Sequence, residues 1–288
     1  MTAPAAQERR APAPVRIPAV ASLSLERVLS GGAVDASVLG VSSHALWFDT
    51  AGAVVAVTTR DAIRLPNGVE IASTSEAGLL ESVAHGASVV VRPDALDFGG
   101  LIVDLVRWWD PRPALPCTTN EDLVVAIDGF PHSVPGLDTR PLASALSGTS
   151  SRDLVDASMT LLGRGPGLTP EGDDVLAGSL AAIRTFGMAL GSSSALTMLD
   201  AAEEPLVTAA NRQTTAFSAA LIRSSIRGEV AAPVGGFLRA LAGRGDIDVH
   251  HRDLLRVGHT SGPALAAGIV LGIGSLIAAV PTPNGGVQ

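Results

Sequence analysis

The sequence contains no lysine, so every permanently charged basic side chain is an arginine. A Walker-type phosphate lysine, a Schiff base and a lysine general base are therefore excluded. The formal net charge is −8 at pH 7, and the arginines form no cluster along the chain. We expect no nucleic-acid partner, because neutralising phosphates requires grouped basic side chains.

Cysteine is almost as scarce, since Cys117 is the only one in 288 residues. No intramolecular disulfide can form, which fits a reducing cytoplasm. Cys117 lies in a proline-rich connector, where we expect a structural role. The first residues, rich in proline and alanine, include no uninterrupted apolar run, so we predict a disordered tail over residues 1–21 and no secretory signal. A cytoplasmic location is expected.

Long hydrophobic runs are few, and the last one, residues 264–280, is at the lower limit for a membrane span. It contains three glycines and has no flanking basic residues. We predict a buried, closely packed helix there and no membrane association. Hydrophobic residues make up 47% of the chain, which is enough for a sizeable core.

The first half of the chain shows the alternation typical of strands, and we predict a β-rich domain over residues 22–135. Residues 38–50, 53–65 and 86–96 are predicted strands, separated by turn signals. A short helix is predicted over residues 76–84 and an amphipathic helix over 98–109. Residues 123–130 are interpreted as one more strand. We expect a small antiparallel sheet or a partial barrel.

The second half is rich in alanine and leucine at helical periodicity, and we predict an all-helical domain over residues 136–281, followed by a tail over 282–288. The fold class is therefore α+β. The predicted helices cover residues 152–163, 173–190, 194–210, 215–228, 234–243 and 263–280.

The stretch GRGPGLTPEGDD, residues 163–174, is a glycine-rich turn that opens one of these helices. Its glycines permit positive φ and close approach of the backbone to a ligand. Thr169 is a suitable N-cap and Pro170 a suitable first helical residue. The free N–H groups of Glu171 and Gly172, with the helix dipole, would then bind an anion.

Two aspartates, Asp173 and Asp174, end the first turn of that helix and admit more than one role. Each can simply stabilise the helix dipole, by roughly 0.3–1 kcal/mol. Together they can hold Mg²⁺ against a substrate phosphate. Either can instead accept N–H donors from an amide substrate.

A second stretch, GHTSGPALAAG at residues 258–268, aligns with the first without gaps, so that Gly172 matches Gly262 and Gly178 matches Gly268. A glycine inside a helix costs roughly 1 kcal/mol relative to alanine, which suggests that the two helices cross closely. Both helix beginnings would then face one pocket. His259 either caps the second helix or acts as an acid or hydrogen-bond donor there.

Between the two stretches, hydroxyl groups recur at Thr214, Thr215 and Ser218. Thr215 and Ser218 lie near one face of a predicted helix. They can bind a ligand, or they can hydrogen-bond to the preceding turn.

These three motifs, in this order, resemble the bacterial family that includes the AllH-type subunit of oxamate carbamoyltransferase. Its pattern is G-x-G-P-G-L-T-P-S-G-D-D, then a hydroxyl-rich T-T helix, then G-H-[ST]-S-G. The resemblance covers roughly residues 155–275 and departs from the pattern at Glu171, where a serine is usual, and at Ala264, where an aspartate is expected.

The resemblance implies carbamoyl transfer between carbamoyl phosphate and an oxamate-like acceptor, in allantoin-linked purine catabolism. It also implies other subunits of a carbamoyltransferase complex as partners. The alternative is a non-catalytic subunit that binds a small anion and regulates its partners. The candidate catalytic residues are Asp173, Asp174 and His259, with Mg²⁺ at the two aspartates as the candidate metal. The candidate substrate-binding residues are Gly165, Gly167, Thr169, Gly172, Thr215, Ser218, Thr260, Ser261 and Gly262.

Overall fold

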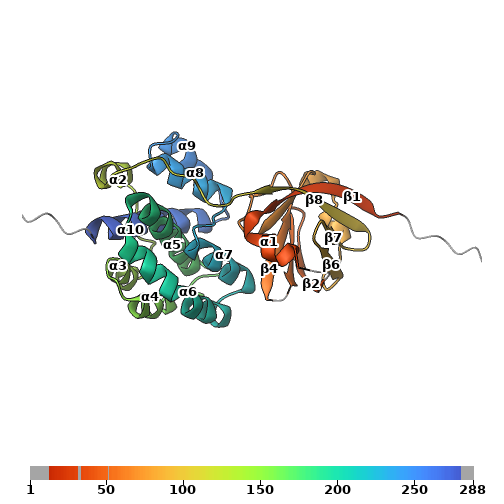
Figure 1. Ribbon diagram of the computed structural model, residues 1–288, viewed down its shortest axis with the longest axis horizontal. Coiled ribbons are helices and arrows are strands. Elements are labelled where there is room, and N and C mark those ends of the chain that lie inside the picture. The colour runs from red at the N-terminus through yellow and green to blue at the C-terminus, as the bar shows by residue number, and fades with distance from the viewer. Residues whose placement is uncertain (1–12, 32–33, 51, 280–288) are drawn as a thin grey trace, which may run out of the picture. The chain divides into compact units, whose positions relative to one another are not determined.

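The computed structural model describes residues 13–31, 34–50 and 52–279. They form two compact units with separate hydrophobic cores, one built of strands and one of helices (Figure 1). The helical unit starts at Trp109 and also includes residues 22–24 and 63–68, so the helical part begins earlier than residue 136. Residues 1–12 of the predicted tail over 1–21, and the whole predicted tail over 282–288, lie outside the described residues.

The strand unit is a closed barrel in the order β1-β5-β4-β3-β2-β6-β7-β8, so the expected antiparallel sheet closes completely. Its core consists of buried valine, isoleucine, leucine, alanine and phenylalanine side chains, among which Phe48 packs edge-on against Phe98 at 6.0 Å between ring centroids. The strands are β1 (Val15–Ser22), β2 (Val34–Val41), β3 (Ala45–Thr50), β4 (Ala53–Thr58), β5 (Gly68–Ile71), β6 (Ser88–Arg92), β7 (Ala95–Asp97) and β8 (Leu101–Trp109).

Two of the barrel strands correct the sequence interpretation. The predicted amphipathic helix over residues 98–109 is wrong, because Leu101–Trp109 form β8 and pair with β7. Its β-branched and aromatic residues favour a strand, and the barrel requires a closing partner for β7. Residues 15–21, expected within the tail, belong to β1 (Val15–Ser22), which pairs with β5. The predicted helix over 76–84 is two single 3-10 turns, Ser75–Ala77 and Leu80–Ser82; a short helix, α1 (Glu26–Leu29), lies elsewhere in this unit.

The helical unit contains α2 (Asn120–Ile127), α3 (Arg140–Leu146), α4 (Ser151–Met159), α5 (Glu171–Leu190), α6 (Ser193–Gln213), α7 (Ala216–Ile226), α8 (Ala232–Leu241), α9 (Ile247–Leu255) and α10 (Ser261–Ala278). All six predicted helices are present. The strand predicted over residues 123–130 is wrong, because residues 123–127 belong to α2. The local cause is a capping box, in which Thr119 and Asp122 satisfy each other's backbone N–H groups.

The helices α5 and α10 form the centre of this unit (Figure 1). By length and composition α10 could cross a membrane, but 72% of it is buried inside the protein. The close crossing predicted from glycine is confirmed. A Cβ at Gly178 would lie 2.4 Å from the Leu265 carbonyl oxygen, and one at Gly268 would lie 2.2 Å from that of Val175.

The crossing is parallel, because the contacts advance in the same direction along both helices. Gly268 meets Val175, while Gly272, four residues later, meets Ser179, again four residues later. The Ser179 hydroxyl donates to the Gly268 carbonyl oxygen at 2.9 Å across the contact. The beginnings of α5 and α10 therefore lie at the same end of the pair.

Candidate functional site

The two glycine turns meet through a direct side-chain contact. The Oγ1 atom of Thr169 and the Oγ atom of Ser261 are 2.9 Å apart, although 92 residues separate them in the sequence. Glu171 and Ser261, which align in the two stretches, are each the first residue of their helix. The aligned stretches thus have equivalent positions in space as well as in sequence.

The start of α5 differs from the prediction by one residue. Pro170, with φ −54° and ψ 144°, is the N-cap and the helix begins at Glu171, so Thr169 is not the cap. Its hydroxyl is instead used in the contact with Ser261. The N–H of Gly172 is not free either, because it donates to the Arg164 carbonyl oxygen at 2.9 Å. The turn therefore folds back on its own helix before any ligand is bound.

Asp173 holds this folded turn together. Its Oδ1 atom accepts the Gly163 N–H at 2.8 Å, and its Oδ2 atom accepts the hydroxyls of Thr214 and of Ser218, the latter at 2.7 Å. The carboxylate is fully buried, so these donors replace its hydration. Asp173 thereby joins the glycine turn to the junction of α6 and α7.

The hydroxyl groups at the start of α7 contact the same glycine turn. Thr215 is the N-cap of α7, where its Oγ1 atom accepts the Ser218 N–H at 3.0 Å. The same hydroxyl donates to the Leu168 carbonyl oxygen at 2.6 Å, inside the glycine turn. All three motifs noticed in the sequence are therefore joined by hydrogen bonds into one cluster.

Asp174 has a different environment from its neighbour. It is only 5% exposed, and its Oδ2 atom has no hydrogen-bond partner. Burial raises the pKa of this carboxyl group to about 7, with further contributions from the charges of Asp173 and Glu171, against a hydrogen bond from Ser261 that lowers it. At neutral pH the group can therefore either donate or accept a proton.

The outer side of the cluster is open to solvent. Gly165 and Gly167 are exposed and have positive φ, and a Cβ at Gly167 would have no neighbour within 4 Å. His259 is exposed, and Thr260 is the half-buried N-cap of α10 without a side-chain cap bond. Asp174 is thus the buried part of the candidate site, and the turns are its exposed part.

The glycines Gly172 and Gly262 pack against protein backbone. A Cβ on Gly172 would lie 2.1 Å from the Leu161 carbonyl oxygen, and one on Gly262 would lie 2.3 Å from that of Leu254. The Gly262 N–H donates to the Val257 carbonyl oxygen at 2.8 Å. Both glycines let the preceding segment approach the helix closely, which brings each turn into place.

Mg²⁺ between the two aspartates does not fit this geometry. Both oxygens of Asp173 already accept protein donors. In the described part of the chain, no three His, Cys, Asp or Glu side chains group so that they could hold a metal ion. Ala264, where an aspartate was expected, is buried and supplies no further ligand.

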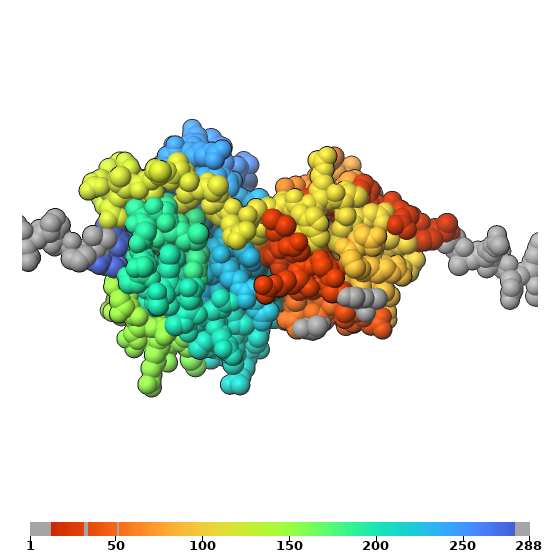
Figure 2. Space-filling view, in the orientation of Figure 1, coloured from red at the N-terminus to blue at the C-terminus, as the bar shows by residue number. Residues whose placement is uncertain are grey.

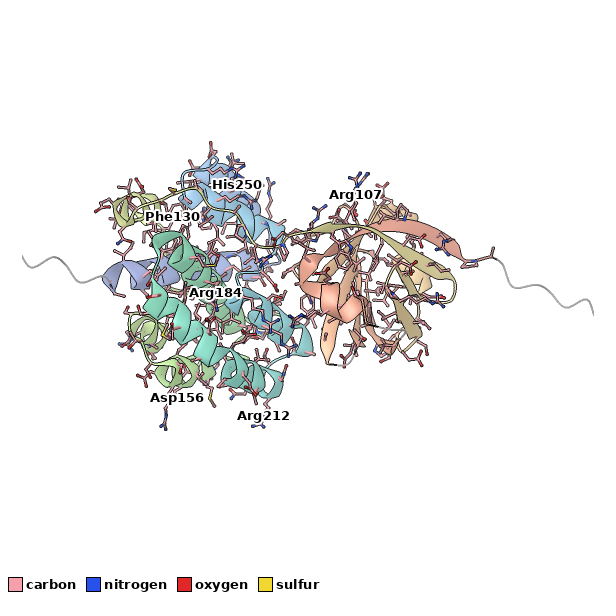
Figure 3. All side chains as sticks on the ribbon, in the orientation of Figure 1. Arg107, Phe130, Asp156, Arg184, Arg212 and His250 are labelled. Carbon is pink, nitrogen blue, oxygen red and sulfur yellow. The ribbon has the colours of Figure 1, made fainter. Side chains whose placement is uncertain are left out.

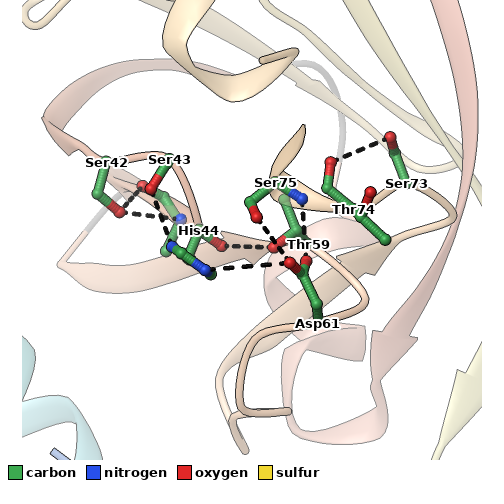
Figure 4. Close-up of polar contacts among 9 residues, drawn as sticks. Ser42, Ser43, His44, Thr59, Asp61, Ser73, Thr74 and Ser75 are labelled. Carbon is green, nitrogen blue, oxygen red and sulfur yellow. Dashed lines mark hydrogen bonds and ion pairs between the residues drawn. The ribbon is translucent and has the colours of Figure 1, made fainter. Parts of the chain in front are cut away.

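A second polar cluster lies in the barrel unit, around the turn between β2 and β3 (Figure 4). Ser43 Oγ is 2.9 Å from His44 Nδ1, and His44 Nε2 is 4.0 Å from Asp61. The His44 side chain is 56% exposed. The Ser75 hydroxyl and that of Thr59 hold the pKa of Asp61 below its usual range. A solvated imidazole with so long an ion pair is weakly oriented, so we do not treat it as a catalytic group.

Comparison with known proteins gives a family match within the helical unit. Residues 161–273 match the family model described as oxamate carbamoyltransferase subunit AllH, which confirms the family resemblance of the three motifs. The match begins just before the glycine turn and ends within α10, so it covers the whole hydrogen-bonded cluster. No solved structure matches the chain.

Proposed function

We propose that this chain is a subunit of a carbamoyltransferase-type complex and binds a small anionic amide or phosphate ligand at the paired starts of α5 and α10. Carbamoyl phosphate and oxamate have this chemistry, and allantoin-linked purine catabolism is the implied context. The observation that carries the proposal is the unpartnered Oδ2 atom of buried Asp174. A buried polar atom without a partner is costly unless a ligand satisfies it.

The charge of Asp174 affects how well this place can accept an anion. Parallel helices with adjacent beginnings bring two positive dipole ends together, which amount to about one positive charge. Ionised Glu171, Asp173 and Asp174 would more than offset that charge and repel an anionic ligand. Protonation of Asp174 removes one of these negative charges, so that an anionic ligand meets less repulsion at the exposed glycine turn.

In this proposal each residue of the site has a separate role. The backbone of Gly165 and Gly167 approaches the anionic group, and Thr169, Thr260 and Ser261 offer hydroxyls beside it. Asp174 accepts an amide N–H when ionised and donates to an oxygen when protonated. His259 polarises a carbonyl group from the outer side. Transfer would depend mainly on positioning and electrostatic stabilisation. Asp173, Thr215, Ser218, Gly172 and Gly262 build the site.

The test is carbamoyl transfer by the assembled complex containing Asp174→Asn. We expect transfer to fall at least about a hundredfold, the range typical of a lost acid–base group. Asp153→Asn is the matched control, because Asp153 is also in the first turn of a helix, α4, but is exposed. Transfer by Asp174→Asn at the control's rate would reject the catalytic assignment.

A regulatory subunit is the second candidate, and it predicts a different pattern. Ligand binding to the isolated chain, measured by calorimetry, would then be lost in Asp174→Asn. The assembled complex would keep its maximal turnover and change only its response to the ligand concentration. A loss of turnover at saturating ligand identifies the catalytic role instead.

A further inference from the structure

The hydroxyl group of Ser261 lies at the contact between the two glycine turns. Its Oγ atom is 2.9 Å from Oγ1 of Thr169, and the same hydroxyl forms the hydrogen bond that acts on the carboxyl group of Asp174. Thr169, Ser261 and Asp174 are therefore linked in a chain of hydrogen-bonding groups. Of the two hydroxyls, that of Ser261 is the one bonded to the carboxyl group.

Ser261 is also the part of this chain that combines contact with Asp174 and access from outside. It is the first residue of α10, most of which is buried. In Figure 2 the last residues of α10, in dark blue, are visible at the left edge of the helical unit. At the other end of the helix, Ser261 is half-buried and the nearby His259 is exposed. The hydroxyl is thus partly open to a small ligand at the turns.

Asp174 has the properties of a base for this hydroxyl. Burial raises the pKa of its carboxyl group to about 7, and the charges of Asp173 and Glu171 act in the same direction. A carboxyl group of this kind can accept a proton and release it again at neutral pH. Its Oδ2 atom has no hydrogen-bond partner and is therefore available to take the proton.

The start of α10 also offers backbone donors beside the hydroxyl. Within residues 52–279, the N–H groups of Thr260 and Ser261 have no hydrogen-bond acceptor, whereas the next one, of Gly262, is bonded to Val257. Both free groups lie at the positive end of the helix dipole. Adjacent free N–H groups next to a nucleophilic hydroxyl can stabilise the oxyanion that forms when the hydroxyl attacks a carbonyl group.

We propose that Ser261 is a nucleophile that takes up the carbamoyl group and holds it as a serine carbamate before it reaches the acceptor. This inference rests on the proposed function, which supplies the transferred group. In the first step Oγ of Ser261 attacks the carbonyl carbon of carbamoyl phosphate, and the bond from that carbon to the phosphate oxygen breaks. Asp174 takes the hydroxyl proton and passes it to the leaving phosphate.

The second step returns the side chains to their starting state. The acceptor nitrogen attacks the carbonyl carbon of the serine carbamate, and the bond from that carbon to Oγ breaks. Asp174 takes a proton from the nitrogen and returns it to Oγ of Ser261. Thr169 is a positioning residue in this scheme, because its hydroxyl contacts Oγ of Ser261.

The test is to trap the serine carbamate in the assembled complex, supplied with carbamoyl phosphate and no acceptor and then quenched in acid. Mass spectrometry of the digested chain should show a carbamoyl group on Ser261. The chain has no lysine, so cyanate released from carbamoyl phosphate should label chiefly the terminal amine and the exposed Cys117. Cyanate alone is the control and should leave Ser261 unmodified. Labelled phosphate should also exchange into carbamoyl phosphate without acceptor, because the first step is reversible.

Ser261→Ala should lower transfer by at least about a thousandfold and abolish both the adduct and the exchange. Ser193→Ala is the matched control and should have no effect, because Ser193 is also the first residue of a long helix, α6, but is exposed. Thr169→Val should slow transfer about tenfold with little change in KM, and Thr169→Ser should restore it.

The inference and the proposed function can fail separately. Normal transfer by Ser261→Ala, with transfer lost in Asp174→Asn, would overturn the nucleophile and leave the proposed function in place. A natural complex that transfers the group but shows neither the adduct nor phosphate exchange would do the same, because transfer would then be direct. If neither variant changes transfer, both proposals are rejected.

Discussion

At the scale of the residue, Asp173 and Asp174 are adjacent and have opposite roles. Asp173 has three protein donors, whereas one oxygen of Asp174 has none. Their difference follows from helix geometry, because successive side chains point about 100° apart around the axis. The sequence indicates that the pair matters, but which aspartate is satisfied depends on Gly163, Thr214 and Ser218, which are distant in the chain.

Asp173→Asn should destabilise the protein by roughly 3 kcal/mol. The amide replaces one accepting oxygen with a donor, so at least one of the donors from Gly163, Thr214 and Ser218 loses its acceptor in the interior. Urea unfolding measures the effect. Asp156→Asn is the control, because Figure 3 shows Asp156 extending from the surface of the helical unit. Equal unfolding midpoints for the two variants would contradict the tethering role.

Asp174→Asn should stabilise the protein, and more so as the pH rises. The folded-state pKa of about 7 lies above the ordinary value of 3.8. The neutral carboxyl group is therefore the form that the folded state favours. Its contribution to the free energy of unfolding of the natural chain is fully present below about pH 4 and is lost as the pH rises through 7. The variant does not titrate, so its advantage should reach up to about 4 kcal/mol at pH 8 and vanish near pH 4. Urea unfolding at both pH values checks this, and a constant difference would show that Asp174 is not buried as described.

The same substitution separates function from structure. If Asp174→Asn is more stable at pH 8 and yet inactive, its carboxyl group is kept at a cost in stability for a functional reason. A purely structural residue would lose stability when replaced.

At the scale of the element, the parallel contact of α5 and α10 brings the two turns together. Gly178→Ala should destabilise the protein by roughly 1–3 kcal/mol, because the new methyl group would meet the backbone of Leu265 and Ile269. Gly274→Ala in α10 is a matched control. Its Cβ would meet no atom within 4 Å, so helix propensity should make it more stable by up to about 1 kcal/mol. Thermal unfolding distinguishes the two, and a loss of stability in both would contradict this account.

Element types could be predicted from the sequence where periodicity was strong, as for α5, α6 and α10. The predictions were wrong where a local pattern is compatible with both a helix and a strand. Residues 101–109 fit one helical face, but closure of the barrel selects a strand. Residues 123–127 are apolar enough for a strand, but the Thr119–Asp122 capping box selects α2. The capping box is visible in the sequence; the closure of a barrel is not.

For the candidate site, the sequence indicated the three motifs, the glycine crossing and the convergence of the turns. It did not indicate the buried, unpartnered oxygen of Asp174, which results from the packing around the start of α5 and follows no motif. Sites built on a repeated turn leave a pattern in the sequence, whereas sites built on tertiary packing alone do not.

At the scale of the whole molecule, the two units have hydrophobic cores with no residue in common. Phe48→Ala removes a fully buried ring from the barrel core and should cost about 3–5 kcal/mol there. Hydrogen exchange followed by mass spectrometry should show faster exchange in β3 and its neighbours β2 and β4, and unchanged exchange in α5 and α10. Gly178→Ala should show the reverse pattern.

Because the family match lies entirely in the helical unit, Phe48→Ala should also leave ligand binding at the glycine turns intact. Faster exchange in α5 with Phe48→Ala would mean that the two cores unfold as one, and the site could then no longer be assigned to the helical unit alone.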